Sequence, residues 1–244
     1  MARQSAHGVP VLLTRPKADS ESFAAALTAR FGARVRPVVA PLLAPRFLTP
    51  DLPAQDYCGV IFTSSQAVEG ARRLGVALPR RAWCVGHKTA EVASKAGFDA
   101  ISADGDADDL IEVIKSDPPN GRILYLRGVD TRGNIPETLN YSGIDTDVAI
   151  VYAQEAQPLG AMALVLLTTP SDLIVPLFSP RTAALFRAAL PADAKAHLHF
   201  ATMSAAVAEP IQSLPHTALV IARRPDAKAM LDAVDSLLAG LPPP

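Results

Sequence analysis

The feature that most constrains the fold of this chain is an internal repeat. The segment FTSSQAV, which begins at Phe62, resembles FSPRTAA, which begins at Phe178. The next matching segments begin 23 residues further on in both copies, VGHKTAEVASKAGF at Val85 and ATMSAAVAEPIQSL at Ala201. Spacing that is conserved over two consecutive segments indicates two copies of one structural unit.

A further matching pair occupies a displaced position. VLLTRP, from Val11, resembles ILYLRGVDTR, from Ile123, and the match aligns Arg15 with Arg127. The first of these segments precedes its FSPRTAA partner, whereas the second follows its FTSSQAV partner. The simplest explanation is that one domain is inserted into the other.

The repeat predicts the domain boundaries. We expect one discontinuous domain of residues 1–37 and 155–244, and an inserted domain of residues 41–148. Residues 36–43 and 147–156 would be the two crossings between them. Both crossings are rich in β-branched residues with apolar alternation, which predicts a two-stranded β linker. An isolated two-stranded ribbon is only marginally stable, so we expect a hinge there.

Each repeated unit reads as a strand, a turn and a helix. Segments such as AVEGARRLG and TAEVASKAG place apolar residues at three- and four-residue steps, as in an amphipathic helix. Strands that alternate with helices predict a parallel sheet covered on both faces. A length of 244 residues fits two such domains. The predicted fold class is therefore α/β, with two open parallel-sheet domains of the flavodoxin or Rossmann-like type.

Composition excludes several function classes. The formal net charge of −1 argues against nucleic-acid or membrane binding, and no apolar run reaches the roughly 20 residues of a membrane span. The first residues lack the apolar segment of a signal peptide, so we expect a cytoplasmic protein, as a monomer that binds a small molecule. Cys58 and Cys84 read as reduced thiols. His197 and His199 would share one face of a strand, but no third metal ligand is in reach by sequence.

The predicted strand ends carry hydroxyl, glycine and cationic residues, each just before a helix. Ligands of open α/β sheets bind beyond the carboxyl ends of the strands, and helix N-termini favour anions. Small hydroxyl residues are also ordinary helix N-caps, which is the alternative explanation for any single one. Together, the strand ends of both domains, with their cations, favour a ligand with several carboxylates or phosphates. The candidate substrate-binding residues are Arg15, Thr63, Ser64, Ser65, Gly86, His87, Lys88, Thr89, Arg127, Arg132, Ser179, Arg181 and Ser204.

The ordered set of segments resembles the uroporphyrinogen-III synthase family over nearly the whole chain. The matching segments are LLTRP, IFTSSQAV, VGHKTAEVASKAGF, LRGVDTRGNIPETL, VYAQEA and FSPRTAALF. The resemblance implies two α/β domains joined by a β ladder. It also implies a lyase of tetrapyrrole and haem biosynthesis that cyclises hydroxymethylbilane, with loss of water, a spiro intermediate and inversion of ring D. No metal or organic cofactor takes part in that reaction.

The same resemblance singles out Tyr152 as the catalytic residue. The VY of VYAQEA matches the family's motif tyrosine, which is implicated in helping the substrate hydroxyl leave. Strand alternation would place Tyr152 on one face with Val148 and Ile150, beside the proposed cleft. The alternatives are a tyrosine that only packs under the hinge and a role in proton transfer for His87.

The chain departs from the family in one segment. Where ATMSAAVA has Met203 and Ala205, the family commonly has a glycine and a threonine. Ser204 is the candidate replacement for the missing hydroxyl.

A second function remains open from sequence. A non-catalytic two-domain binding protein that closes on an anionic metabolite would have the same hinge and the same tips. A nucleotide-sugar transferase or epimerase normally needs a longer chain and a glycine-rich phosphate loop, and neither is seen. An assay that resolves the product isomers of hydroxymethylbilane discriminates the enzyme from the binding protein.

Overall fold

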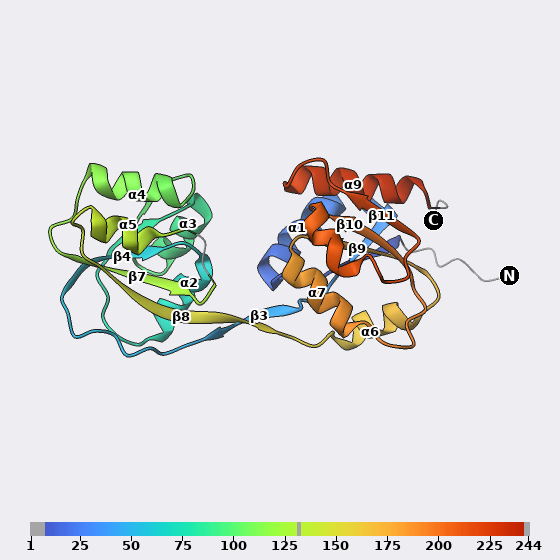
Figure 1. Ribbon diagram of the computed structural model, residues 1–244, viewed down its shortest axis with the longest axis horizontal. Helices are drawn as coiled ribbons and strands as arrows, with labels where there is room; N and C mark the ends of the chain where they lie inside the picture. The colour runs from blue at the N-terminus through green and yellow to red at the C-terminus, as the bar shows by residue number, and fades with distance from the viewer. Residues whose placement is uncertain (1–7, 131–132, 242–244) are drawn as a thin grey trace. The chain divides into compact units, whose positions relative to one another are not determined.

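The protein divides into two compact units, each built around its own sheet. The computed structural model describes residues 8–130 and 133–241. Unit 1 comprises the chain up to Ala44 together with the chain from Ala156 onward, and unit 2 comprises Pro45–Glu155. Figure 1 follows the chain from one unit to the other and back.

Unit 1 contains a five-stranded parallel sheet in the order β11-β10-β9-β1-β2. Its strands are β1 (Val9–Leu13), β2 (Val35–Val39), β9 (Asp172–Leu177), β10 (His197–Thr202) and β11 (Ala218–Ile221). Numbered within the unit, this is the flavodoxin-like order 2-1-3-4-5. The chain therefore leaves β1 toward one edge of the sheet and leaves β9 toward the other.

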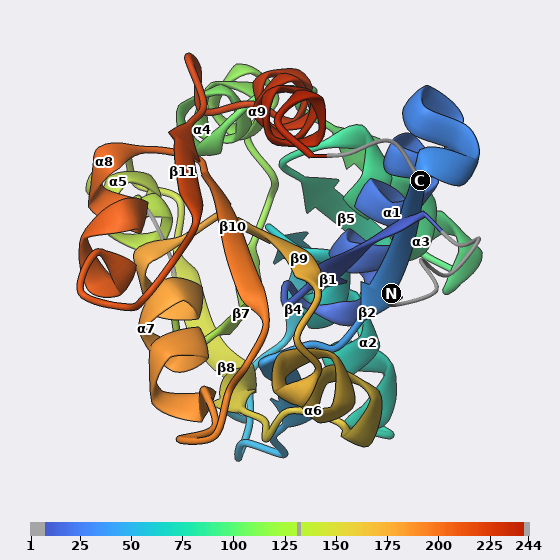
Figure 2. The same cartoon turned by 90° about the vertical axis from the view of Figure 1, so that its right-hand side faces the viewer.

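Helices cover both faces of this sheet because consecutive strand residues are both apolar. Leu12, Val175 and Phe200 are buried on one face, and Val11 and Ile174 are buried on the other. The first face packs against α6 (Ala161–Thr168), α7 (Pro180–Ala189), α8 (Ala205–Ala208) and the 3-10 turn Glu209–Ile211. The second face packs against α1 (Lys17–Phe31) and α9 (Ala227–Ala239), and a 3-10 turn at Gly32–Arg34 follows α1. Figure 2 shows this sheet with its two helical layers.

Unit 2 contains a six-stranded sheet in the order β3-β8-β7-β4-β5-β6. The strands are β3 (Leu43–Phe47), β4 (Tyr57–Phe62), β5 (Arg81–Cys84), β6 (Asp99–Ser102), β7 (Arg122–Gly128) and β8 (Thr146–Ala156). The pairs β4/β5, β5/β6, β4/β7 and β7/β8 are parallel.

Four helices enclose the unit 2 sheet. The helices α2 (Ser65–Arg73) and α3 (His87–Lys95) pack on the face that carries Val60 and Phe62. The helices α4 (Ala107–Ser116) and α5 (Ile135–Tyr141) pack on the face that carries Ile61, Trp83 and Tyr125. Unit 2 is therefore also a sheet between two helical layers.

The two units have the same spatial plan in a different chain order. The repeat aligns β7, β8, β4, β5 and β6 with β1, β2, β9, β10 and β11. The sheet order β8-β7-β4-β5-β6 of unit 2 then equals the order β2-β1-β9-β10-β11 of unit 1. The prediction of two open α/β sheets made mainly of parallel strands is confirmed.

The linker differs from the prediction in its outgoing strand. Val35–Val39 is not part of a ribbon but the edge strand β2, which pairs with β1 and buries Val35. The segment that pairs with β8 is β3, several residues later (Figure 1). The Leu48 amide donates to the Val151 carbonyl and the Gln157 amide donates to the Leu42 carbonyl, both at 2.9 Å, so β3 and β8 run antiparallel.

Within the described ranges 8–130 and 133–241, no helix combines the length and apolarity that crossing a bilayer requires.

The composition of the unit 2 core generates a prediction about folding. Both apolar clusters of this unit consist of residues from 45–155. A fragment of residues 43–156, which keeps β3, should therefore fold alone and unfold in one cooperative transition. Denaturant titration by circular dichroism measures this, and the fragment 1–44 should remain unfolded as a control. A fragment 43–156 that binds hydrophobic dyes and unfolds without cooperativity would show that unit 2 depends on unit 1.

Candidate functional site

The site of unit 2 lies at a reversal of strand order. The neighbours β4 and β7 pair in parallel, with Ile61 opposite Tyr125. The chain leaves β4 through α2 to β5 on one side and leaves β7 through α5 to β8 on the other side. Because the two connections diverge, the carboxyl ends of β4 and β7 have open space beyond them, which is where ligands of such sheets bind.

A cavity of about 380 Å³ occupies this position. Its lining comes from the ends of β4, β5, β6 and β7 and from β8. The lining residues are Thr63, Ser64, Val85, Gly105, Asp106, Ala107, Gly128, Asp130 and Tyr152. Three residues predicted from sequence, Thr63, Ser64 and Tyr152, therefore meet in one cavity.

Two tyrosine hydroxyls pair with two neighbouring tip hydroxyls. Ser64 Oγ lies 3.0 Å from the Tyr152 hydroxyl, and Thr63 Oγ1 lies 3.1 Å from the Tyr125 hydroxyl. Tyr125 is buried, and this burial raises the pKa of its phenol. Tyr125 therefore remains a neutral hydrogen-bond partner that fixes Thr63.

A register shift places Tyr152 in the cavity. Arg127 pairs with Ile150, but the next residue, Gly128, pairs with Tyr152, so Val151 is an extra residue on β8. Such a bulge interrupts the side-chain alternation of a strand. The predicted face of Val148, Ile150 and Tyr152 therefore ends at Val151, and Tyr152 packs against the apolar cluster that contains Val151.

Gly128 makes room for the tyrosine ring. A Cβ added at Gly128 would lie 2.6 Å from Cζ and 2.9 Å from the hydroxyl oxygen of Tyr152. Contacts this short do not occur in proteins, so any side chain at position 128 would displace the phenol. The position of the phenol thus depends on a glycine that lies on the neighbouring strand.

Two helices begin at this edge of the sheet. Ser64 is the N-cap of α2, because its side chain accepts the Ala67 amide at 3.2 Å, and Ser65 is the first helical residue. Gly86 precedes α3, and its Cα faces open space. Unpaired amides at helix N-termini favour anions.

At the first turn of α3, the side chains of His87 and Lys88 are exposed and that of Thr89 is buried. The His87 side chain is exposed and lies 3.3 Å from Glu91. Lys88 is exposed, whereas Thr89 is buried. These positions adjoin Val85, which lines the cavity, but none of the three lines it.

Arg127 is engaged by the end of its own strand. Its Nη1 donates to the carbonyls of Gly128 at 3.1 Å and Val129 at 3.2 Å. The guanidinium therefore braces the backbone beside the cavity. Arg132, the other predicted cation of this segment, lies outside the described residues.

In unit 1 the corresponding strand ends carry a stacked arginine. The Arg15 guanidinium lies 4.3 Å above the ring of Phe178, and its Nη2 lies 3.3 Å from Asp19. Ser179 caps α7 by accepting the Thr182 amide at 3.2 Å. Arg15 and Ser179 follow the neighbouring strands β1 and β9, the equivalents of β7 and β4.

Met203 and Ser204 lie in the segment of unit 1 that differs from the family pattern. Met203 packs against both apolar clusters of unit 1, so its side chain belongs to the core of that unit. Ser204 precedes the four-residue helix α8, and its carbonyl accepts the amides of Val207 and Ala208 at 3.1 Å. Arg181 is exposed on the first turn of α7.

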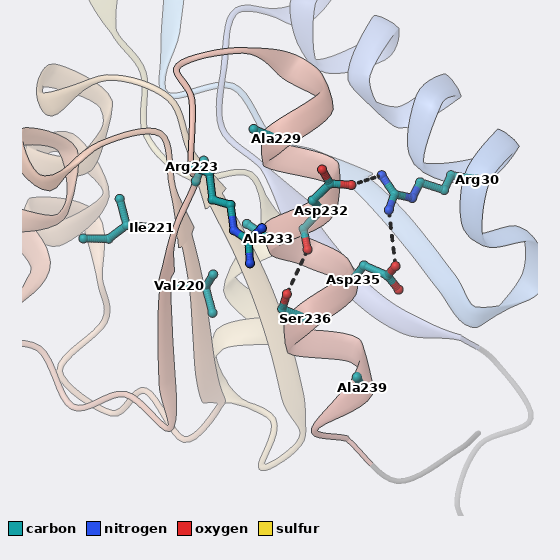
Figure 3. Close-up of a pocket in the computed structure, with 11 residues that line it drawn as sticks. Arg30, Val220, Ile221, Arg223, Ala229, Asp232, Ala233, Asp235, Ser236 and Ala239 are labelled. Atoms are coloured by element: carbon teal, nitrogen blue, oxygen red, sulfur yellow. Dashed lines mark hydrogen bonds and ion pairs between the residues drawn. The ribbon is translucent and has the colours of Figure 1, made fainter.

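A larger groove of about 570 Å³ lies elsewhere in unit 1, along β11 and α9 (Figure 3). Among its polar groups, Arg30 is paired with Asp232 at 2.6 Å and with Asp235 at 3.3 Å. None of the predicted site residues lines this groove. Arg30 and its two aspartates satisfy one another, whereas the unit 2 cavity gathers hydroxyls at a strand-order reversal, so the smaller cavity is the better candidate.

Sequence reasoning missed several residues of the cavity. Gly128 is recognisable from the sequence as a strand-end residue beside Arg127, but it is not among the predicted site residues. Asp106 belongs to a run that reads as a solvated helix start, and it does cap α4. Asp106 lines the cavity because it follows the carboxyl end of β6. Tyr125 gave no signal, because a strand tyrosine is ordinary core.

Comparisons with known proteins agree with this architecture. A family model described as uroporphyrinogen-III synthase HemD matches residues 21–232. A uroporphyrinogen-III synthetase structure from Helicobacter pylori 26695 is 16% identical, with a TM-score of 0.58, and the alignment covers 94% of this chain and 99% of that one. At this identity the likeness shows the fold alone.

A mutant uroporphyrinogen III synthase from the extremely thermophilic bacterium Thermus thermophilus is 17% identical, with coverage of 96% of this chain and 100% of that one and a TM-score of 0.45. The search of curated proteins found no match.

The contact between Gly128 and Tyr152 generates a prediction about stability. Gly128→Ala should lower the free energy of unfolding by about 1–3 kcal/mol, because the added methyl forces the ring and strand apart. Denaturant titration measures the change. Gly240→Ala is the matched control, since Gly240 has a φ of −86° and an added Cβ would meet only the Leu237 carbonyl at 3.6 Å, and it should not lower the free energy of unfolding. Equal stability of the two variants would mean that the phenol is not confined by Gly128.

Proposed function

Since the chain belongs to the uroporphyrinogen-III synthase family, we propose that it cyclises hydroxymethylbilane to uroporphyrinogen III in tetrapyrrole and haem biosynthesis. The observation that carries this proposal is the family match over residues 21–232, which takes in strand ends of both units. The enzyme would be a hydro-lyase, because the cyclisation releases one water molecule.

The proposed reaction consists of bond exchanges that need no external redox partner. The terminal C–O bond of the bilane breaks, and the departing hydroxyl takes a proton to become water. The azafulvene carbon that remains forms a bond to the substituted position of ring D, which gives a spiro intermediate. The bond from that position to the methylene carbon that links ring D to ring C then breaks, and this methylene carbon bonds to the other α-carbon of ring D, across the pyrrole nitrogen. Ring D is thereby inverted, and loss of a proton restores the aromatic pyrrole.

The proposed proton donor is Tyr152. Its hydroxyl lines the unit 2 cavity and is held by Ser64 at 3.0 Å. A phenol carries a proton that it can donate to an oxygen as that oxygen departs. Thr63, held by buried Tyr125, contributes a second fixed hydroxyl to the same cavity. This arrangement suits a reaction in which the leaving hydroxyl must be protonated as its C–O bond breaks.

The remaining task is to hold a flexible polyanion in one geometry. The acetate and propionate groups of the bilane match the amides at the starts of α2, α3 and α7 and the cations Arg15, Lys88 and Arg181. Fixing the chain before ring closure removes much of the entropic barrier. Ser65, Gly86, His87, Thr89, Arg127, Arg132, Ser179 and Ser204 remain proposed substrate-binding positions.

We also propose that the protein acts in the cytoplasm as a monomer, without metal or organic cofactor. The alternative of a non-catalytic binding protein would use the same strand ends. The family match favours the enzyme.

The activity itself is testable. Purified, metal-stripped protein should convert hydroxymethylbilane to the type III isomer, which chromatography separates from the type I isomer that forms spontaneously. Accumulation of type I alone, under conditions in which a known synthase works, would reject the enzyme and favour the binding protein.

Removal of the Tyr152 hydroxyl tests the proton donor. Tyr152→Phe should lower kcat roughly ten- to a hundredfold, because a positioned proton donor contributes about 10²-fold or more and this substrate ionises readily. KM and the unfolding midpoint should change little, since the ring is retained. Wild-type kcat in a folded Tyr152→Phe protein would remove Tyr152 from the mechanism and direct attention to His87.

A further inference from the structure

We propose that Ser64 is a positioning residue for Tyr152 and not primarily a substrate-binding residue. The two hydroxyl oxygens lie 3.0 Å apart, and both residues line the same cavity. This inference rests on the proposed function and assigns Ser64 a role within it. The sequence alone predicts Ser64 as a substrate-binding residue.

The hydrogen-bond capacity of Ser64 allows its hydroxyl to donate to the Tyr152 oxygen. A serine hydroxyl has one proton to donate and two lone pairs that accept. One lone pair accepts the Ala67 amide at 3.2 Å, as the N-cap of α2. Among the described contacts of Ser64 Oγ, the oxygen of Tyr152 is the acceptor for its proton. In the proposed arrangement Ser64 donates to Tyr152, and the phenol keeps its own proton for the cavity.

The same contact favours proton donation by Tyr152. When the phenol gives up its proton, negative charge develops on its oxygen. A donor that is already aimed at that oxygen stabilises the charge without reorganisation. Because Ser64 is fixed as a helix cap, its hydroxyl holds this direction without a change in the backbone.

The backbone around Tyr152 fixes the ring, so that Ser64 needs to fix only the hydroxyl. The Val129 amide donates to the Tyr152 carbonyl at 2.9 Å. The bulge at Val151 turns the side chain toward the cavity, and Gly128 leaves the space that the ring fills. The strand end thus places the ring, and the α2 cap orients its oxygen.

Thr63 provides a contrast within the same tip. Its hydroxyl pairs with Tyr125, which is buried and does not line the cavity. The two adjacent hydroxyls therefore differ in their partners. Thr63 contacts a tyrosine of the core, and Ser64 contacts the proposed proton donor. A role through Tyr152 is thus specific to Ser64.

A double-mutant cycle tests the proposal. Steady-state formation of the type III isomer is measured for wild type, Ser64→Ala, Tyr152→Phe and the double variant. Ser64→Ala should lower kcat roughly three- to tenfold with KM unchanged, and in the Tyr152→Phe background it should change kcat by less than about twofold. Ser64→Thr, which keeps the hydroxyl, should restore kcat to within about threefold of wild type.

The loss of the helix cap needs its own control. Asp226→Ala removes the cap of α9, whose side chain accepts the Ala229 amide at 2.7 Å, and lies outside the site. It should destabilise the protein about as much as Ser64→Ala does but leave kcat unchanged. Ser64→Gly serves if the alanine variant folds poorly, because glycine is tolerated at N-caps.

The possible outcomes separate the two proposals. A raised KM with unchanged kcat in Ser64→Ala would overturn the positioning role and favour substrate binding. Losses that multiply in the double variant would show that Ser64 acts independently of Tyr152 and would also overturn it. Wild-type protein that yields only the type I isomer would overturn the proposed function, and the role of Ser64 with it.

Discussion

The parallel pairing of β4 with β7 is the contact on which the arrangement of unit 2 depends. Phe62 and Leu126 are the last residues that pair between these two strands, so Thr63 lies beyond the pairing, while Arg127 and Gly128 still pair with β8. The chain turns away from β4 and β7 in opposite directions, which leaves space beyond their carboxyl ends. Ser64 and Gly128 then face that space from adjacent strands, and Tyr152 enters it from β8. In unit 1 the equivalent neighbours β1 and β9 bring Arg15 against Phe178.

Most of the fold could be predicted because its signals are local. The repeat with its displaced segment indicates two similar α/β units, and helical and strand periodicities are legible within each copy. The pairing partner of Val35–Val39 was not predictable, because the same apolar alternation suits a free ribbon and a sheet edge. That choice depends on β1, whose carbonyls and amides pair with the segment, and on Phe31 and Leu27, which bury Val35 in the same cluster.

The site could be predicted in its parts but not in its geometry. Hydroxyls that follow strands and precede helices single out Thr63 and Ser64, and both residues line the cavity. That Ser64 is also the cap of α2 depends on where this helix begins. Tyr152 was named from family resemblance, but the bulge that turns it into the cavity is a one-residue register shift with no mark in the sequence. Arg127 shows the opposite case, a cation at the expected strand end whose guanidinium is occupied by the carbonyls of Gly128 and Val129. Residues distant in the chain position Ser64 and Tyr152, whereas the contacts of Arg127 are with its immediate neighbours.

The permuted order of the repeat has a consequence for synthesis on the ribosome. In unit 2 the strands β4 to β8 emerge consecutively, so their sheet is complete once Ala156 has been made. In unit 1, Val11 on β1 pairs with Ile174 on β9, more than half the chain later. At a synthesis rate of roughly 5–20 residues per second, β9 is made on the order of ten seconds after β1 and β2. The inserted unit is thus the first to complete, and the apolar residues of β1 remain exposed during the interval, the period in which chaperones would bind this chain.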